Sequence, residues 1–198
     1  MSHRLLRDAS FWLFLFAVDQ DLARTEHERG CCCGARLHRA DFPRKPRGGP
    51  DRLPVEVCYR LSFCCSREGC RKRSTPPSVR FLGRTVYLGA VVLLTTAMRQ
   101  GPTPRGLGEL RRLFGVDRRT LARWRVFWLE RFPGSRFWKI GRARFQQPVD
   151  VATLPLSLLD AFLRGRDFVE DERDGWRRLL LFLSPISSGR RDSIELVR

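Results

Sequence analysis

The first periodic pattern of hydrophobic and polar positions lies near the start of the chain. Apolar residues three to four positions apart are typical of an amphipathic helix. We therefore predict a helix over residues 9–28 that packs against the rest of the protein. Its apolar side would carry Leu13, Phe16, Ala17, Leu22 and Ala23, and its polar side Asp19, Gln20, Arg24 and Glu28.

The pattern changes after residue 30. Residues 42–54 are dense in proline and glycine, which predicts a loop. Residues 55–65 alternate well enough for a strand, and residues 79–88 could be its partner. Residues 31–86 are therefore expected to form a short β module with cysteines at its turns.

From residue 87 onward the pattern is helical. Helices are expected over residues 87–100, 107–114, 118–132, 156–163 and 176–183, whereas residues 184–198 are expected to be frayed. The predicted fold class is mainly α with a small β module: a zinc-ribbon-like N-terminal part, a three-helix helix-turn-helix unit and a helical tail. The predicted boundaries are 1–30 for the N-terminal helix, 31–86 for the β module, 87–145 for the helix-turn-helix unit and 146–198 for the tail.

The charge of the chain adds a candidate partner to this picture. The 198 residues carry a formal net charge of +17, and the two stretches 36–84 and 85–144 hold all of the excess. A concentrated basic block beside neutral flanks is typical of a surface that binds a polyanion. All but Lys45, Lys72 and Lys139 of the 38 basic residues are arginine, which suits bidentate contact with phosphate and guanine. A GC-rich genome would also favour arginine.

The sequence shows no clear membrane-spanning segment and no clear secretory signal. No apolar run approaches the ~20 residues that a membrane-spanning helix needs. The run over residues 11–18 lacks a small-residue cleavage site and is followed at once by Asp19 and Asp21. We therefore expect a cytoplasmic protein with no membrane partner.

The most specific motif lies at the junction of the two predicted helices 107–114 and 118–132. Gly115 allows the positive φ that ends a helix, Val116 can plug the corner, and Asp117 is a good N-cap for the next helix. Leu121, Trp124 and Trp128 would face the core. This arrangement predicts a helix-turn-helix, and an ordinary helical hairpin with a solvated arginine face is the alternative.

The predicted second helix would then present its N-terminal end to the major groove of DNA. The outward residues would be Arg118, Arg119, Ala122 and Arg123, with Thr120, Arg125 and Arg105 placed to reach phosphates.

Residues 115–128 (GVDRRTLARWRVFW) resemble the helix-turn-helix of bacterial insertion-sequence transposases. In those proteins the motif grips the ends of the mobile element. The resemblance implies DNA contacts by Arg118, Arg119, Thr120 and Arg123, and a protein associated with a mobile genetic element.

All seven cysteines lie between residues 31 and 70. Cys65 and Cys70, followed by basic residues, look like the rear knuckle of a transposase zinc ribbon. The resemblance makes residues 30–34 the front knuckle, although Gly30 stands where a ligand would normally precede Cys33. The expected structural Zn²⁺ ligands are Cys31, Cys33, Cys65 and Cys70, with His38 and Cys64 in reserve. Cysteines buried as small hydrophobes, or a site that has decayed, are the alternatives, and the odd number argues against disulfides.

These observations together favour sequence-directed binding of double-stranded DNA without catalysis. Arg71, Lys72 and Arg73 are expected to contact phosphates after the last cysteine. No acidic triad, phosphate-binding loop or nucleophile arrangement indicates an enzyme. An RNA-binding or ribosome-associated protein is the alternative, because residues 136–145 are basic and aromatic and could stack bases. A structural protein with an acidic partner is a third class. A homodimer through residues 176–183, or a partner transposase, could complete the assembly.

Overall fold

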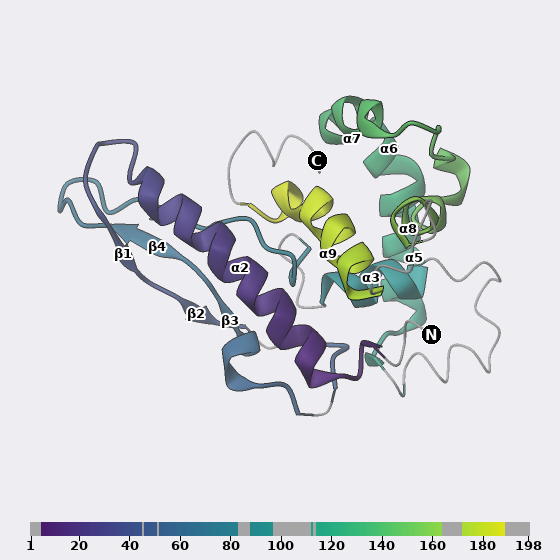
Figure 1. The fold of residues 1–198 in the computed structure, drawn as a ribbon, viewed down its shortest axis with the longest axis horizontal. Helices are drawn as coiled ribbons and strands as arrows, with labels where there is room; N and C mark the ends of the chain where they lie inside the picture. The colour runs from purple at the N-terminus through teal and green to yellow at the C-terminus, as the bar shows by residue number, and fades with distance from the viewer. Residues whose placement is uncertain are drawn as a thin grey trace.

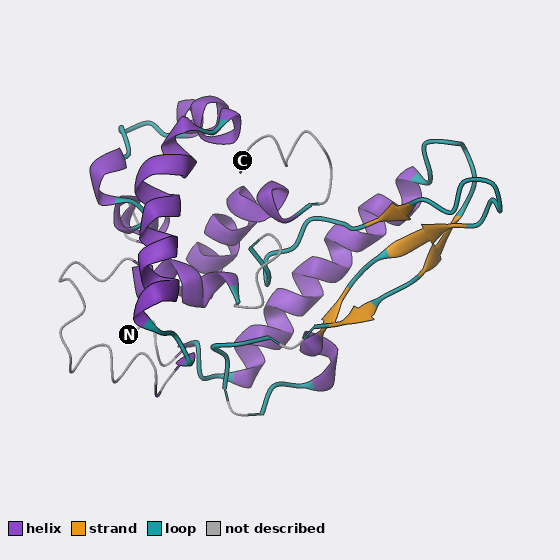
Figure 2. Cartoon of the chain, turned by 180° about the vertical axis from the view of Figure 1, so that it is seen from behind, coloured by secondary structure: helices purple, strands orange, loops and turns teal. Residues whose placement is uncertain are grey.

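The computed structural model describes residues 5–44, 46–50, 52–82, 88–96, 112, 114–163 and 172–188. As predicted, the chain is mostly helical with a small antiparallel β part. The long helix α2 lies between the short strands on one side and the remaining helices on the other (Figures 1 and 2). The α-helices are α2 (Ala9–Arg29), α3 (Gly89–Thr96), α5 (Arg118–Val126), α6 (Phe132–Gly134), α7 (Arg136–Gly141), α8 (Leu156–Leu163) and α9 (Glu172–Leu183).

The strands are short and make two antiparallel sheets. One sheet has the order β1-β4-β5 and the other pairs β2 with β3. The strands are β1 (Leu37–Arg39), β2 (Phe42–Pro43), β3 (Tyr59–Arg60), β4 (Phe63–Cys65) and β5 (Arg73–Ser74). The 3-10 helices are η1 (Val55–Cys58), η3 (Arg142–Arg144), η4 (Val151–Thr153) and η5 (Ser184–Ser187), and η2 (Phe127–Arg131) is a π-helical turn between α5 and α6.

Helix α2 is confirmed, and its predicted apolar side was partly wrong: Ala23 is buried and Phe16 and Leu22 pack against the core. Asp8 caps the helix by accepting a hydrogen bond from the Ser10 amide. Leu13 is 43% exposed and Ala17 is exposed, whereas Asp19 is buried. The buried positions are Phe11, Trp12, Leu15, Asp19, Ala23 and Glu26. Both sides of the helix carry apolar residues at helical spacing, so the tertiary partners of Asp19 decide which side faces inward.

Those partners form a polar network inside the protein. The Asp19 carboxylate accepts hydrogen bonds from the Ser78 hydroxyl and the Val79 amide, and it pairs with Arg80 at 2.7 Å. Both charged side chains are fully buried. Arg80 also donates to the carbonyl oxygens of Val57 and Tyr59. A buried charge of this kind persists only when it is paired and hydrogen-bonded, as it is here.

The strand predictions were partly wrong. Residues 55–65 begin with the 3-10 helix η1 and continue as two strands, β3 and β4. The partners of β4 are β1 and β5, whereas residues 79–88 contribute an isolated bridge between Phe81 and Leu88. The Val79 amide donates to Asp19 of α2 instead of to a neighbouring strand, and residues 83–87 of the predicted partner lie outside the described part of the chain.

The helices share one large apolar cluster that contains Trp128, Trp138 and Trp176. Helix α8 has the predicted bounds, and α9 contains the predicted segment 176–183. The apolar face of α9 is buried inside the chain through Trp176, Leu179, Leu180 and Leu183. Residues 184–188 are not frayed, because η5 packs inward and the Ser187 hydroxyl bonds to Ser78. No helix in the described part of the chain is long and apolar enough to cross a membrane.

Candidate functional site

Four cysteine side chains converge at one end of the sheet β1-β4-β5. The sulfur atoms of Cys31, Cys33, Cys65 and Cys70 all lie within 4.8 Å of one another, and these residues can hold a metal ion. The Cys31–Cys70 sulfur distance is 3.8 Å and the Cys33–Cys65 distance is 3.5 Å. A tetrahedral zinc with Zn–S bonds of about 2.3 Å places its sulfurs about 3.8 Å apart. The donor set and spacing therefore fit a tetrahedral metal centre.

The pairing of two strands explains why these cysteines meet. The first pair precedes β1, and the second pair begins at the last residue of β4. In the antiparallel register Leu37 lies opposite Cys65, and His38 lies opposite Cys64. The two turns therefore close over the same end of the sheet. The tight front turn is possible because Gly30 and Gly34 both have positive φ, at 72° and 78°.

Backbone amides point at the sulfurs in both turns. These are the amides of Ala35, beside Cys33, and of Arg67, beside Cys65. The Ala35 amide, with the Cys65 thiol second, lowers the pKa of Cys33 to about 7. Burial raises the pKa of the Cys65 thiol. One sulfur of this pair is thus prepared as a thiolate, the form that binds metal.

The other three cysteines lie outside this cluster. Cys32 is exposed and accepts a hydrogen bond from Lys72, while Cys64 donates to the Arg71 carbonyl. Cys58 lies in η1 and donates to the Pro54 carbonyl. His38, held in reserve as a ligand, is exposed on β1. The cluster therefore consists of the four residues that the sequence singled out.

The second candidate site is the corner before α5. Gly115 has a φ of 63°, Val116 is buried, and the Asp117 carboxylate accepts from the Thr120 amide. That bond lowers the pKa of Asp117. Leu121, Trp124 and Trp128 are buried as predicted, and α3 packs against α5. The predicted helix 107–114 lies outside the described residues apart from Arg112 and Phe114.

The outward side of α5 carries the predicted arginines. Arg118, Arg119, Ala122 and Arg123 are exposed, and Arg123 donates to the Thr120 hydroxyl at 3.0 Å. Thr120 itself is only 4% exposed, so its hydroxyl serves the helix rather than an external phosphate. Arg125 is half-buried, and Arg105 lies outside the described residues. Sequence reasoning missed Val126, which is 38% exposed on the same side, one turn after Ala122.

The basic triplet after the last cysteine is exposed, but two of its members have partners. Arg73 lies over the Phe42 ring, with 5.4 Å to the ring centroid, and donates to the Ala40 carbonyl. Lys72 donates to the Cys32 sulfur at 3.5 Å. Arg71 has a φ of 43°, the left-handed conformation that turns the chain back into β5. The triplet therefore also shapes the rear turn of the cysteine cluster.

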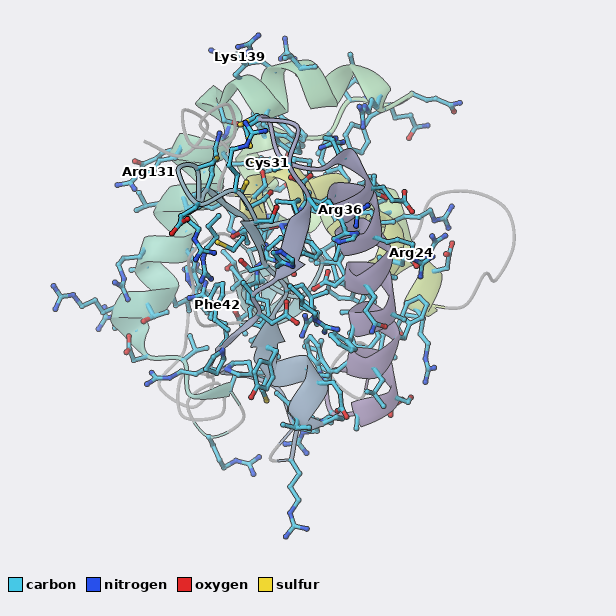
Figure 3. All side chains as sticks on the ribbon, turned by 90° about the vertical axis from the view of Figure 1, so that its left-hand side faces the viewer. Arg24, Cys31, Arg36, Phe42, Arg131 and Lys139 are labelled. Carbon is cyan, nitrogen blue, oxygen red and sulfur yellow. The ribbon has the colours of Figure 1, made fainter. Side chains whose placement is uncertain are left out.

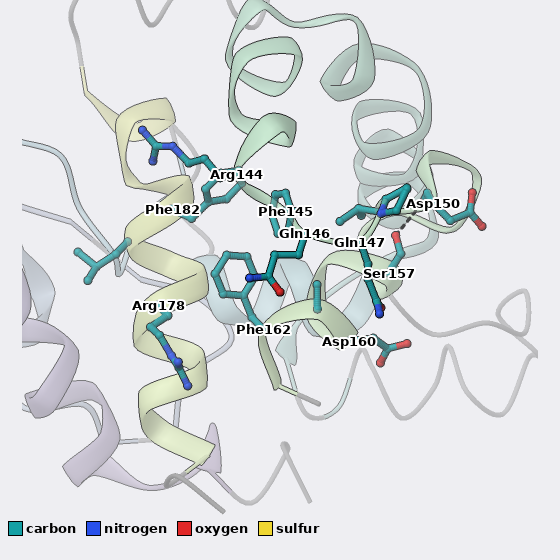
Figure 4. Close-up of a pocket in the computed structure, with 14 residues that line it drawn as sticks. Arg144, Phe145, Gln146, Gln147, Asp150, Ser157, Asp160, Phe162, Arg178 and Phe182 are labelled. Carbon is teal, nitrogen blue, oxygen red and sulfur yellow. Dashed lines mark hydrogen bonds between the residues drawn. The ribbon is translucent and has the colours of Figure 1, made fainter. Parts of the chain in front are cut away.

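An open groove lies beside α8 and α9 (Figure 4). Its aromatic rings pack on one another, with centroids 5.4 Å apart for Phe145 and Phe182 and 5.7 Å apart for Phe162 and Phe182. Its rim mixes Arg144 and Arg178 with acidic Asp150 and Asp160. The rings are occupied by each other and the rim charge is mixed, so the groove does not favour a polyanion.

Comparison of the chain with models of protein families, with characterised proteins and with solved structures gave no match.

Proposed function

We propose that this protein binds double-stranded DNA through the outward side of α5. The observation that carries the proposal is the division of this helix into two sides. Leu121 and Trp124 are buried, whereas Arg119 and Arg123 are exposed on the opposite side, next to the capped N-terminus. Recognition helices present this end to the major groove, and arginine makes bidentate bonds to guanine there.

Sequence-directed binding is supported by the side chains between the arginines. Ala122 and Val126 are exposed on the same side of the helix as Arg119 and Arg123. A small residue permits close approach to the base edges, and apolar side chains contact the methyl group of thymine.

The metal in the proposed function is a structural Zn²⁺ held by Cys31, Cys33, Cys65 and Cys70. Four thiolates would complete its coordination and leave no open position for a substrate. The role of the metal is then to hold the two cysteine turns together, and with them the basic residues 71–73. This arrangement supports a binding protein without catalysis.

The association with a mobile genetic element depends on the resemblance of residues 115–128 to the transposase helix-turn-helix. In this proposal the protein acts in the cytoplasm of a bacterium, as an accessory factor or with a partner transposase. The closed metal site and the basic helix are both consistent with the front part of such a protein, which positions DNA for chemistry performed elsewhere.

The RNA-binding alternative required aromatic rings that are free to stack on bases. Trp138 is only 2% exposed, Phe137 packs on Phe132 and Phe182, and Phe145 packs on Phe162. Trp138 therefore belongs to the apolar core, and Phe137 and Phe145 pack against it. This placement favours a duplex partner over single-stranded RNA.

The test is fluorescence anisotropy with a labelled duplex that the wild-type protein selects from a random pool, and with single-stranded RNA. The double variant Arg119→Ala/Arg123→Ala should weaken duplex binding at least ~10-fold, the effect of losing one bidentate contact. The matched control is Arg24→Ala/Arg177→Ala, which removes the same charge from arginines that are paired with Asp21 and Asp174. Equal binding of the double variant and the control would refute the proposal.

A further inference from the structure

The helix α7 and the 3-10 helix η3 carry a row of basic side chains that plays no part in the function proposed above. Arg136, Lys139 and Arg142 are exposed and stand three positions apart. Residues three apart in a helix lie on neighbouring turns of one side. Figure 3 shows Lys139 at the edge of the molecule, pointing away from the body.

The opposite side of the same segment holds it rigidly against the core. Trp138 and Gly141 are buried, and the Trp138 ring lies 5.2 Å from Phe132 and 6.0 Å from Phe145, centroid to centroid. Ser135 caps α7 by accepting from the Trp138 amide at 3.1 Å. The basic row is therefore displayed on a fixed support and not on a flexible loop.

Within the described residues, this row has no carboxylate partner. Residues 136–144 contain no acidic residue, and no ion pair joins Arg136, Lys139 or Arg142 to the described part of the chain. Three arginines elsewhere do have a carboxylate partner: Arg24 pairs with Asp21, Arg29 with Glu26 and Arg177 with Asp174. Like charges on one rigid side repel one another unless a polyanion lies against them.

We infer that α7 and η3 form a second DNA contact, in which Arg136, Lys139 and Arg142 bind backbone phosphates of the duplex without reading its sequence. The row extends over about 9 Å at 1.5 Å per residue. Arginine and lysine side chains are long and reach independently of one another, so each of the three cations can meet one backbone phosphate. The inference shares its partner with the proposed function but uses different residues, and it adds affinity instead of specificity.

The test uses the full-length protein and a labelled duplex of arbitrary sequence, about two helical turns long. Anisotropy gives the Kd between about 50 and 200 mM salt. Each phosphate contact contributes about 0.9 to the slope of log affinity against log salt. For the triple variant Arg136→Ala/Lys139→Ala/Arg142→Ala the slope should therefore fall by about 2.7. Over this salt range the wild type then loses on the order of 40-fold more affinity than the variant.

The control triple variant is Arg24→Ala/Arg29→Ala/Arg177→Ala, which removes equal charge from arginines that have carboxylate partners. It should keep the wild-type slope. A second variant, Arg136→Lys/Arg142→Lys, keeps the charge and should keep the slope as well. An unchanged slope in the alanine triple variant, or an equal fall in the control, would overturn the inference.

The two proposals fail in different ways. If Arg119→Ala/Arg123→Ala has no effect but the α7 triple variant lowers the slope, the recognition role of α5 is wrong and the α7 contact stands. The converse result leaves α5 as the binding surface and removes α7. A wild-type protein that does not bind duplex DNA at all overturns both.

Discussion

The strand-bearing region around the cysteines and the helical body differ in how much apolar surface they bury. Among the described residues, the cluster beside the cysteines contains Ala23, Leu37, Leu61, Phe63 and Cys65. The cluster shared by the helices contains 27 buried residues, among them Trp12, Trp128, Trp138 and Trp176. One region is held by an extensive core, whereas the other has too few apolar residues for that.

The difference shows why the four sulfurs matter. A small β region with so little core needs a staple to offset the entropy of ordering its turns. A metal bound by four thiolates provides one, because its binding free energy becomes folding free energy. Helix α2 belongs to both regions, with Phe11, Trp12 and Leu15 in the larger cluster and Ala23 in the smaller one.

Removal of the metal should have the largest effect. It should destabilise the strand-bearing region around the cysteines and leave the helical body unchanged. In the chelated protein, hydrogen exchange should become fast in β1, β4 and β5, because the turns that join them lose their common ligand. Exchange in α8 and α9 should not change. Mass spectrometry of deuterated peptides measures both regions in one experiment.

The matched variants are Cys33→Ser and Cys32→Ser, which differ by one position but only one of which touches the cluster. Elemental analysis should find one zinc per chain in the wild type and in Cys32→Ser, and none in Cys33→Ser. If β1, β4 and β5 stay protected from hydrogen exchange in the chelated protein, the metal does not stabilise the strand-bearing region.

The substitution Asp19→Ala should have the next largest effect, because Asp19 joins the two regions. It leaves Arg80 buried without a counter-charge, which costs about 4 kcal/mol of unfolding free energy. Urea unfolding followed by tryptophan fluorescence measures this loss. The double variant Asp19→Leu/Arg80→Met removes both charges and should recover most of the stability. A single variant as stable as the wild type would show that the pair contributes nothing.

The smallest effect should come from Asp117, the N-cap of α5. On acidification, the contribution of this cap should be lost at a lower pH than the metal. The folded pKa of Asp117 is lowered, so its contribution is present above the ordinary value of 3.8 and is lost as pH falls through the folded pKa. Asp117→Asn keeps a hydrogen-bond acceptor but loses the charge. It should therefore lower the free energy of unfolding slightly above the ordinary pKa of Asp117 and should have no such effect below the folded pKa. Protons compete with zinc for the thiolates at a higher pH than the one at which Asp117 is protonated. On acidification, zinc should therefore dissociate before the cap is lost.

Thermal unfolding of the wild type and Asp117→Asn at several pH values, with a zinc indicator present, checks both statements. A stability difference that persists at the lowest pH would contradict the role of the carboxylate. Zinc release that begins only after Asp117 has been protonated would contradict the expected order, in which zinc dissociates first.

Local sequence patterns predicted the elements that are set by interactions within a few residues. The bounds of α8, the start of α5 after Asp117 and the corner at Gly115 follow from helical spacing, capping and the conformational freedom of glycine. The four cysteines of the cluster were also predicted, from the spacing that they share with a zinc ribbon, and the structure brings those four together. The inward side of α2 and the partners of β4 were not predictable in this way.

The sequence by itself determined that the chain is mainly helical and that a basic capped helix follows Gly115, and it named cysteines 31, 33, 65 and 70 as candidates for one cluster. Only the tertiary structure decided that Asp19 faces inward, that β4 pairs with β1 and β5, and that the rings of residues 137–145 enter the core while the cations face outward. Spacing and capping act within a few residues of one helix, so one sequence window reveals them. A buried ion pair such as Asp19–Arg80 joins positions 61 residues apart, and its energy exists only once the fold has excluded water from both groups.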